Sequence, residues 1–300
     1  MRCSAASWWH CALGLLVSVC AVLGGIAPAA AADPVTEVLV VTGDGAPDGN
    51  GLFDELETPV LNEIGQLAFV ATFSGTAGGT DDDRGIVLGS GAPWTQMVRE
   101  GDAAPDGNGS VAFFLSPAIN DDGQVAFGVD YADTSGYPVV DDREGLARGA
   151  GGPLTRIARL GENAPDGNGV FSWLPGATPM NDLGQCGFVA TFDDTTGGSA
   201  DDSALLRSDG GALVTIAREG DGAPDGNGTF SQFALSEGAA LNDAGQVTFR
   251  VTFAGTTGGS SDDKGVIRGD GSPPVQIARE GGLPPDGNGT YRSFDAPVIN

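Results

Sequence analysis

Acidic and amide side chains recur in this chain in a pattern that suits calcium binding. The string Pro-Asp-Gly-Asn-Gly begins at Pro47, Pro105, Pro165, Pro224 and Pro285, with spacings of 58, 60, 59 and 61 residues. Calcium takes six to eight oxygen ligands, and each loop could present several oxygen atoms. The predicted calcium ligands are Asp44, Asp48, Asn50, Asp102, Asp106, Asn108, Asp166, Asn168, Asp221, Asp225, Asn227, Asp286 and Asn288.

Turn chemistry explains the same string without a metal. Proline presets a turn dihedral, and Asp-Gly and Asn-Gly supply residues that adopt positive φ. The EF-hand pattern is not met, because Ala46 stands where a ligand is expected and Glu55 is replaced by Phe113 and Gln232 in later copies. Two hypotheses therefore remain open for these loops, a calcium site and a tight connection between strands.

A second set of carboxylates consists of adjacent aspartates at the end of a long Gly-rich loop. Adjacent carboxylates repel one another unless a cation or an arginine lies between them. Their positions are Asp81-Asp82-Asp83, Asp141-Asp142, Asp201-Asp202 and Asp262-Asp263. A surface charge cluster with the basic residues that follow, a calcium site, and a glycosidase-type acid/base pair are the three interpretations. Glycoside hydrolysis needs two singular carboxylates, so their repetition argues against it.

Two further features repeat along the chain, an arginine and an Asn-x-x-Gly-Gln phrase. An arginine closes one predicted strand of each repeat, and we expect it to form an ion pair with the Pro-Asp-Gly-Asn-Gly loop, within or between repeats. A ring of arginines for an anionic ligand is the alternative. The arginines are Arg99, Arg159, Arg218 and Arg279. The phrase Asn-x-x-Gly-Gln is interpreted as a structural hairpin turn, and its copies begin at Asn62, Asn120, Asn181 and Asn242, with a fifth Asn at Asn300.

The elements that position these residues form a repeat of about sixty residues, which indicates one supersecondary unit stacked on copies of itself. Each repeat contains a strand with strict alternation, followed by three shorter strands separated by turn residues. The alternating strands cover 67–73, 125–131, 186–192 and 247–253. Four short antiparallel strands per repeat are typical of a β-propeller blade. The sequence predicts an all-β propeller, and a β-solenoid is the alternative.

The repeats also define the predicted domain organisation. Residues 1–32 are predicted to be a signal peptide, with an apolar run and Ala30-Ala31-Ala32 before the cleavage point. Residues 33–300 form one repeat domain, with a half-unit at 35–59 and units at 60–118, 119–179, 180–240 and 241–299. We expect the chain to be truncated, so that one further half-unit would complete a five-bladed ring; a longer parent with more units is equally allowed.

Composition excludes several classes of function. The only histidine, His10, and three of the four cysteines lie in the predicted leader, so the mature chain has no histidine for catalysis and no internal disulfide. Cys186 occupies an apolar strand position and is interpreted as a core thiol. A net charge of −26 repels nucleic acid and anionic membranes. We expect a secreted or cell-surface protein with no membrane span in the mature chain.

The repeats resemble those of tandem-repeat proteins secreted by environmental bacteria. The resemblance rests on Leu241–Phe249, which reads Leu-Asn-Asp-Ala-Gly-Gln-Val-Thr-Phe, and on strands such as Ile216–Asp221. It implies a propeller-like fold and, in many such proteins, sorting to the cell surface. It implies no activity.

The sequence favours a non-catalytic binding or adhesion scaffold, stabilised by calcium, whose partner is an extracellular protein or glycan. The alternative is an extracellular propeller enzyme that acts on polysaccharide through Asp carboxylates. An enzyme site should break the repeat. Asp130, Arg250, Trp94 and Trp173 do so, but they are few and scattered, and no catalytic residue is assigned.

Overall fold

A computed structural model describes residues 16–18, 36–115, 117–136, 141–233 and 239–300. The predicted signal peptide lies outside the described residues except for β1 (Leu16–Ser18), which pairs antiparallel with β2 (Thr36–Val38). His10 and the cysteines of the leader are also outside them. Within the described ranges, no helix is long and apolar enough to cross a membrane.

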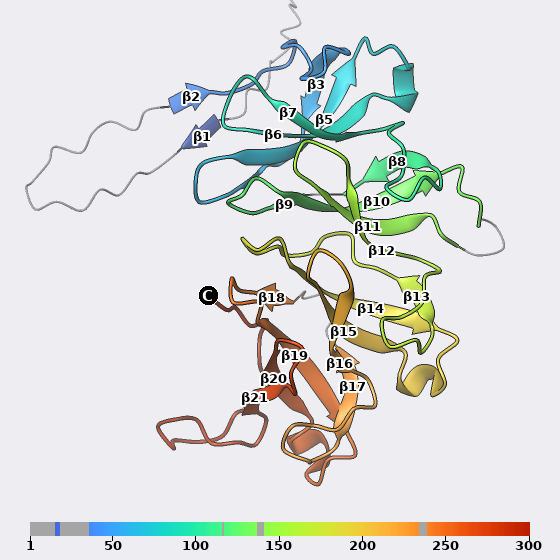
Figure 1. The fold of residues 1–300 in the computed structure, drawn as a ribbon. Helices are drawn as coiled ribbons and strands as arrows, with labels where there is room; N and C mark the ends of the chain where they lie inside the picture. The colour runs from blue at the N-terminus through green and yellow to red at the C-terminus, as the bar shows by residue number, and fades with distance from the viewer. Residues whose placement is uncertain (1–15, 19–35, 116, 137–140, 234–238) are drawn as a thin grey trace, which may run out of the picture.

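Four antiparallel sheets follow one another along a curved path, and each is one blade (Figure 1). Blade 1 comprises β3 (Leu52–Leu56), β4 (Val60–Leu61), β5 (Leu67–Ser74), β6 (Arg84–Gly89) and β7 (Thr95–Arg99). Blade 2 comprises β8 (Ser110–Phe114), β9 (Ala118–Ile119), β10 (Val125–Ala132), β11 (Glu144–Gly149) and β12 (Thr155–Arg159). Blade 3 comprises β13 (Val170–Trp173), β14 (Cys186–Asp193), β15 (Ser203–Ser208) and β16 (Leu213–Arg218). Blade 4 comprises β17 (Thr229–Phe233), β18 (Ala240–Leu241), β19 (Val247–Ala254), β20 (Lys264–Gly269) and β21 (Val275–Arg279).

The fold is an all-β propeller, as the repeat pattern predicts. Every blade is a separate antiparallel sheet, whereas a solenoid would stack its coils into continuous sheets. The β-solenoid alternative is therefore wrong. Short 3₁₀ turns lie in three of the long loops: η1 (Gly79–Asp81), η2 (Gly198–Ala200) and η3 (Gly259–Ser261).

The sheets are offset from the predicted repeat units. The strand that was expected to close the unit 60–118 is β8, and it pairs with β10 of the following unit. The same holds for β13 with β14 and for β17 with β19. Each blade therefore joins the last strand of one predicted unit to the first three strands of the next. This sharing ties neighbouring units together through backbone hydrogen bonds.

The two ends of each blade carry different loops, and the strand register shows which loops lie at which end. At one end, Leu52 pairs with Ser74, so the Pro-Asp-Gly-Asn-Gly loop and the long Asp-rich loop lie together there. At the other end, Leu61 pairs with Leu67, so the Asn-x-x-Gly-Gln turn lies there. We call these the clasp end and the turn end.

Apolar side chains between consecutive blades form the core. The cluster between blades 1 and 2 combines Val70, Ile86 and Met97 of blade 1 with Phe114 and Phe127 of blade 2. Burial of such surface stabilises a fold by roughly 25 cal/mol per Å². On its other side, blade 1 packs its aromatic face against the preceding segment and its own Trp94, whose ring meets Phe69 edge-on at 5.3 Å.

Candidate functional site

The arginine that ends each blade is buried at the clasp end. In blade 1, Nη1 of Arg99 donates to both oxygens of Asp48, at 3.0 and 2.9 Å, and Nη2 donates to the backbone oxygen of Asn50. Its Nε donates to the backbone oxygen of Asp82 at 2.6 Å. The guanidinium lies 4.3 Å above the ring of Phe73. The Arg99 side chain is only 4% exposed. A charge buried to this extent needs an ionic partner, and the Asp48 carboxylate of the same blade is that partner.

The asparagine of the same loop ties the two loops of the clasp end together. The Asn50 Nδ2 donates to Asp82 Oδ2 at 2.7 Å, and Asn50 Oδ1 accepts from the backbone N–H of Ala77. The Asp82 carboxylate also accepts from Gly78 N–H. Hydrogen bonds from Thr76 and Asn50 hold the pKa of Asp82 below its usual value. We call this arrangement of arginine, two aspartates and asparagine the clasp.

All four blades contain the clasp. The bidentate pairs of the later blades are Arg159–Asp106, Arg218–Asp166 and Arg279–Asp225. The amide-to-carboxylate bonds of the later blades are Asn108–Asp142, Asn168–Asp201 and Asn227–Asp262. The predicted ion pair between the strand arginine and the loop is confirmed, and it joins the two edges of one sheet.

The predicted calcium ligands mostly accept hydrogen bonds from protein donors. Asp44, Asp102 and Asp221 each accept from the backbone N–H three residues earlier. The other aspartates and asparagines of the first four loops belong to clasps, while the fifth copy, Asp286 with Asn288, is exposed. Within the described ranges, no three His, Cys, Asp or Glu side chains lie together as a metal site requires. Calcium at these loops stays a prediction.

At the turn end, the Asn-x-x-Gly-Gln phrases of successive blades form a ladder. Asn62 donates through Nδ2 to the backbone oxygen of Asn120 at 2.9 Å, and Asn120 donates in the same way to Asn181 at 3.0 Å. Asn181 bonds to Asn242 and Asn242 to Asn300. The other amide hydrogen of each of the first four asparagines goes to the glutamine four residues on. The ladder therefore links every blade to the next.

The acidic residues beside these asparagines form a second ladder. Glu63 N–H donates to Asp121 Oδ1, Asp121 N–H to Asp182 Oδ1, and Asp182 N–H to Asp243 Oδ1. Each of the three aspartate carboxylates thus uses one oxygen to accept from the preceding blade, while Glu63 takes part only through its backbone N–H. No hydrogen bond to the second oxygen of these aspartates occurs among the described residues.

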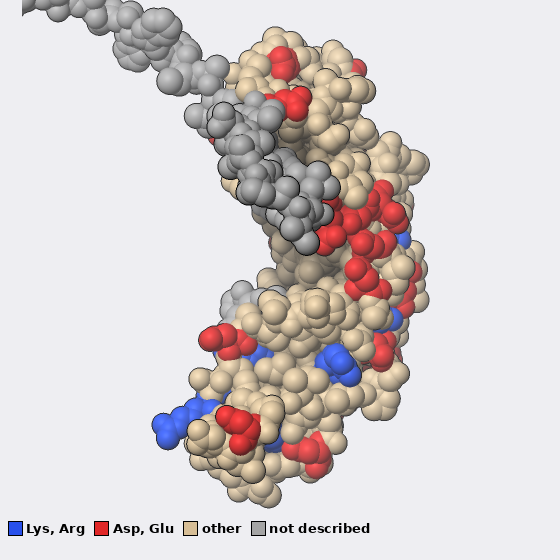
Figure 2. Space-filling model, turned by 90° about the vertical axis from the view of Figure 1, so that its left-hand side faces the viewer, with Lys and Arg blue, Asp and Glu red and all other residues tan. Residues whose placement is uncertain are grey.

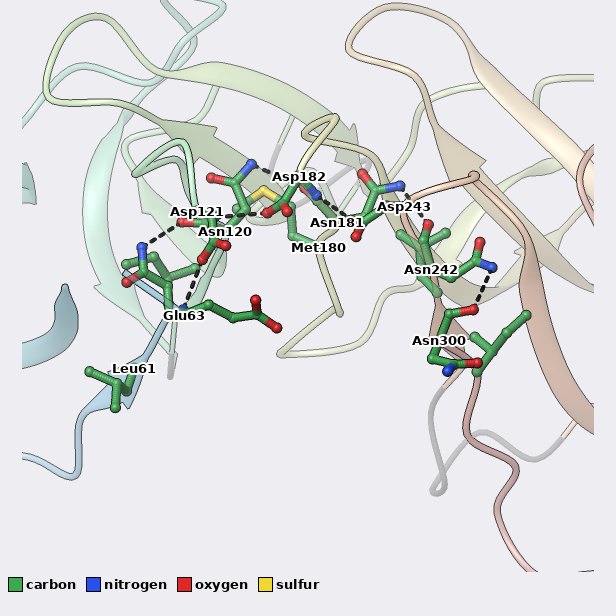
Figure 3. A pocket seen from close by; sticks show the side chains of 14 residues that line it. Leu61, Glu63, Asn120, Asp121, Met180, Asn181, Asp182, Asn242, Asp243 and Asn300 are labelled. Carbon is green, nitrogen blue, oxygen red and sulfur yellow. Dashed lines mark hydrogen bonds between the residues drawn. The ribbon is translucent and has the colours of Figure 1, made fainter. Parts of the chain in front are cut away.

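The two ladders line an open pocket of about 390 Å³, which we call the axial pocket (Figure 3). All four blades contribute to it, so it lies where the blades converge. Apolar surface is contributed by the residues that precede the asparagines, which are Leu61, Ile119, Met180, Leu241 and Ile299. The ladder uses both amide hydrogens of the first four asparagines, while Glu63, Asp121, Asp182 and Asp243 bring carboxylates to the lining. The pocket favours a ligand that donates hydrogen bonds or carries positive charge.

The interpretation of the turn phrases as structural hairpin turns does not predict the axial pocket. A signal was present: each asparagine follows an apolar residue, and in four copies an acidic residue comes next. An apolar–amide–acid triplet in every repeat predicts a ring of like groups once the repeats are arranged around one axis. Only the placement of all turns at the same end of the blades turns that pattern into a pocket.

Carboxyl pairs lie at the clasp end. Glu100 lines a groove of about 390 Å³ between blades 1 and 2. Its burial and the neighbouring Asp83 carboxyl raise the pKa of Glu100 to about 7. Burial also raises the pKa of Glu219, which faces Asp202. Blade 2 differs, because Arg143 and Leu160 occupy these two positions. Blade 2 therefore replaces both members of the carboxyl pair.

The residues that break the repeat are not gathered into one site. Arg250 donates to the backbone oxygen of Phe294, and Asp130 is an exposed residue of β10 near Arg143. Trp94 is partly buried and packs against the core, and Trp173 lies at the end of β13 with 37% exposure. None of the four lines the axial pocket.

Comparison with known proteins places the chain in a family. Residues 30–300 match the profile of a family of unknown function (DUF7453). The chain belongs to this family. No curated protein sequence matches it.

Several solved structures resemble this family member at low identity. A Trypanosoma rangeli sialidase in complex with sialic acid is 13% identical with a TM-score of 0.37, covering 81% of this chain and 41% of the sialidase. A Fusarium graminearum α-L-arabinofuranosidase is 11% identical with a TM-score of 0.31, covering 82% of this chain and 71% of that enzyme. A puromycin hydrolase mutant is 13% identical with a TM-score of 0.31, covering 85% of this chain and 44% of the hydrolase. The chain thus spans less than half the length of the sialidase and the hydrolase, and scores at this level carry nothing about activity.

Proposed function

We propose that this chain is a secreted or cell-surface scaffold that binds, without catalysis, an extracellular protein or glycan in the axial pocket. The observation that carries the proposal is the repeated lining of that pocket. Every blade supplies the same apolar–asparagine–acid triplet, or a close variant of it. An active site needs groups with different roles and different environments, such as an acid and a nucleophile. A row of equivalent groups, one from each blade, instead suits recognition.

The chemistry of the lining specifies the ligand class. Glu63, Asp121, Asp182 and Asp243 bring negative charge to the rim, and the protein carries a net charge of −26. On the face shown in Figure 2, acidic side chains occur from top to bottom and are densest in the middle, whereas most of the visible basic ones lie in the lower half. Complementary charge speeds encounter and excludes partners of like charge. The ligand should therefore present ammonium or guanidinium groups on a partly apolar body.

Titration calorimetry with matched probes tests this proposal. The probes are a lysine tetrapeptide, chitosan oligosaccharides as a cationic glycan, and a glutamate tetrapeptide. We expect the two cationic probes to bind and the anionic one to fail. Binding should weaken strongly as salt rises, because exposed charges are screened. Equal binding of all three probes, or of none, contradicts the proposal.

A triple variant assigns the binding to the axial pocket. Asp121→Asn, Asp182→Asn and Asp243→Asn keep each Oδ1 acceptor of the ladder but remove three charges. The matched control removes three charges elsewhere through Glu37→Gln, Asp54→Asn and Glu55→Gln, which are exposed residues outside the pocket. We expect the first variant to lose affinity and the control to keep it. Equal losses would mean that only net charge matters.

Calcium is the cofactor that this proposal includes, as a stabiliser of the Asp-rich loops. Thermal melting of the protein in EDTA and then in millimolar calcium tests it. A ligand that binds only the native state raises its stability by mass action, so a calcium site would raise the melting temperature by many degrees. An unchanged melting temperature would show that these loops hold no stabilising calcium and that the clasps alone keep them in place.

A further inference from the structure

Two grooves lie between consecutive blades at the clasp end. The 1/2 groove, between blades 1 and 2, has a volume of about 390 Å³, and the 2/3 groove, between blades 2 and 3, has about 500 Å³. The same positions of the repeat line both: residues of two long loops, the residues that follow the clasp arginine, and the start of the next blade's first strand. The two linings can therefore be compared position by position.

The 2/3 groove has apolar side chains where the 1/2 groove has polar ones. Leu160 stands at the position of Glu100, and Val170 stands at the position of Ser110. Leu160 and Phe171, which also lines the 2/3 groove, belong to the core between blades 2 and 3 and are 5% and 3% exposed. Val170 is half-buried. Part of the wall of the 2/3 groove is thus continuous with the hydrophobic core, where the apolar body of a ligand would be shielded from water.

Two adjacent carboxylates lie on the exposed side of the 2/3 groove. Asp193 and Asp194 are exposed, and among the described residues neither side chain has a hydrogen-bond or ionic partner. The third acid of the lining, Asp141, is already paired, because Arg143 donates to both of its carboxylate oxygens at 3.1 Å. Adjacent carboxylates repel one another unless a cation lies close to them. The groove therefore combines two unpaired negative charges with apolar surface.

The backbone at Asp194 adopts a conformation that favours glycine. Asp194 has φ +57, and Asp133, at the same position of the 1/2 groove, has φ +56. Blades 1 and 4 have glycine at this position, and Gly75 and Gly255 adopt φ +69 and φ +67. Glycine adopts this region without steric cost, whereas aspartate does not. Folding therefore does not require the Asp194 carboxylate, and a role in binding accounts for it.

We propose that the 2/3 groove binds a small organic cation. Its apolar body contacts Leu160, Val170 and Phe171, and its ammonium group lies against the carboxylates of Asp193 and Asp194. Ligand pockets measure about 300 to 1,000 Å³ and combine apolar walls with a few polar groups, and this groove has both properties. An anion of the same shape would face two carboxylates, so charge provides the selectivity. The site is separate from the axial pocket, because the two linings share no residue.

Titration calorimetry and amide NMR with three probes test the proposal. The probe 4-phenylbutylamine carries both the charge and the apolar body, 4-phenylbutyrate reverses the charge, and propylamine lacks the phenyl group. We expect 4-phenylbutylamine to bind at least about ten-fold more tightly than either of the others. It should also shift the amide signal of Gly161 more than that of Gly101, which occupies the same position in the 1/2 groove. An unmoved Gly161 signal, or equal affinity of the three probes, would overturn the proposal.

A double variant that copies blade 4 removes the two carboxylates and keeps the turn. Asp193→Ala with Asp194→Gly reproduces the residues at 254 and 255, which form the same turn in blade 4. We expect this variant to bind 4-phenylbutylamine at Gly161 at least about ten-fold more weakly, without a lower melting temperature. The matched control, Asp54→Asn with Glu55→Gln, removes two exposed charges in blade 1 and should leave the affinity unchanged. Equal losses in the two variants would show that only net charge attracts the amine, and the proposal would fail.

Two further variants separate the apolar contribution and the axial pocket. Val170→Thr copies Thr229 of blade 4 and leaves the charge unchanged, so affinity should fall by about three-fold because apolar surface is lost. An unchanged affinity would contradict the contact with Val170. The triple variant of the axial pocket, Asp121→Asn with Asp182→Asn and Asp243→Asn, should keep the shift at Gly161. Loss of that shift in the triple variant, with the shift retained in the Asp193→Ala, Asp194→Gly variant, would place the amine in the axial pocket and overturn this inference alone.

Discussion

Arg99 and Asp48 lie 51 residues apart in the chain, yet Nη1 of Arg99 reaches both oxygens of the Asp48 carboxylate, at 3.0 and 2.9 Å. Asp48 precedes the first strand of blade 1, and Arg99 ends its last strand. The ion pair therefore spans one end of the sheet and holds its two edges in one register. Three more pairs of the same kind repeat this in blades 2 to 4.

Loss of a clasp arginine should destabilise the protein strongly. Arg99→Met leaves the Asp48 carboxylate, which is 30% exposed, without its cation. Removal of one partner of a largely buried pair costs about 3 kcal/mol. Urea unfolding followed by tryptophan fluorescence measures the loss. The control is Arg143→Met, whose pair with Asp141 is about half exposed on both sides, and surface pairs contribute about 0 to 1 kcal/mol. Equal effects of the two variants would contradict the role of the clasp.

The asparagine ladder should depend on the amide nitrogen. Asn120 is 3% exposed and donates to Gln124 and to the backbone oxygen of Asn181. Asn120→Asp keeps the shape but replaces two donors with a carboxylate facing acceptors, so we expect a loss of about 3 kcal/mol in unfolding free energy. The matched control is Asp122→Asn, the reverse exchange at an exposed residue of the same turn, which should change stability little.

The carboxyl pairs should make the protein more stable at mildly acidic than at alkaline pH. The pKa of Glu100 rises from 4.5 to about 7 on folding, so the native state binds the extra proton between these values. Stability from this group is complete below the unfolded pKa and is lost as pH rises through the folded one. The clasp carboxylates of Asp82, Asp201 and Asp262 have lowered pKa values. Their contribution to stability is present above the unfolded pKa and is lost as pH falls through the folded one. Melting temperatures should therefore peak at about pH 5 to 6.

Blade 2 supplies the variant that tests the pH dependence. Asp83→Arg with Glu100→Leu transfers the Arg143 and Leu160 arrangement of blade 2 into blade 1. We expect this double variant to weaken the fall in melting temperature between pH 5 and pH 8. If the pH profile of the double variant matches that of the unchanged protein, the Asp83–Glu100 pair does not bind the proton.

Cys186 should be unreactive in the folded protein. Its side chain is fully buried in the core between blades 2 and 3, and burial raises its pKa to about 11. The thiolate is the reactive form, so alkylation at pH 8 should be slow until the protein unfolds. Mass spectrometry of the Cys186 peptide before and after denaturation measures this. Rapid alkylation of the native chain would show that the core opens readily.

Much of the blade was predictable from residue patterns. Strict alternation from Leu67 to Phe73 indicates a strand with one apolar face, and this strand is β5. A turn phrase and an apolar strand at fixed spacing indicate repeated antiparallel sheets. The pairing of Arg99 with the loop was also predictable, because an unpaired charge near the end of an apolar strand needs a partner.

Residue patterns alone did not reveal which strands share a sheet or which turns of neighbouring sheets lie side by side. The strand β8 carries no local mark that tells whether it pairs with β7 or with β10, since both are apolar and close in sequence. The axial pocket depends on all the asparagine turns lying at one end of their blades.

Residue patterns alone indicate the period, the all-β class, the turn positions and the residues that repeat. Those are local properties, because alternation and turn chemistry depend on neighbours a few residues away. Packing in three dimensions sets the offset of the sheets, the asparagine ladder and the axial pocket. These features depend on contacts between residues far apart in the chain, such as the bond from Asn62 to Asn120, 58 positions away, which no local pattern specifies.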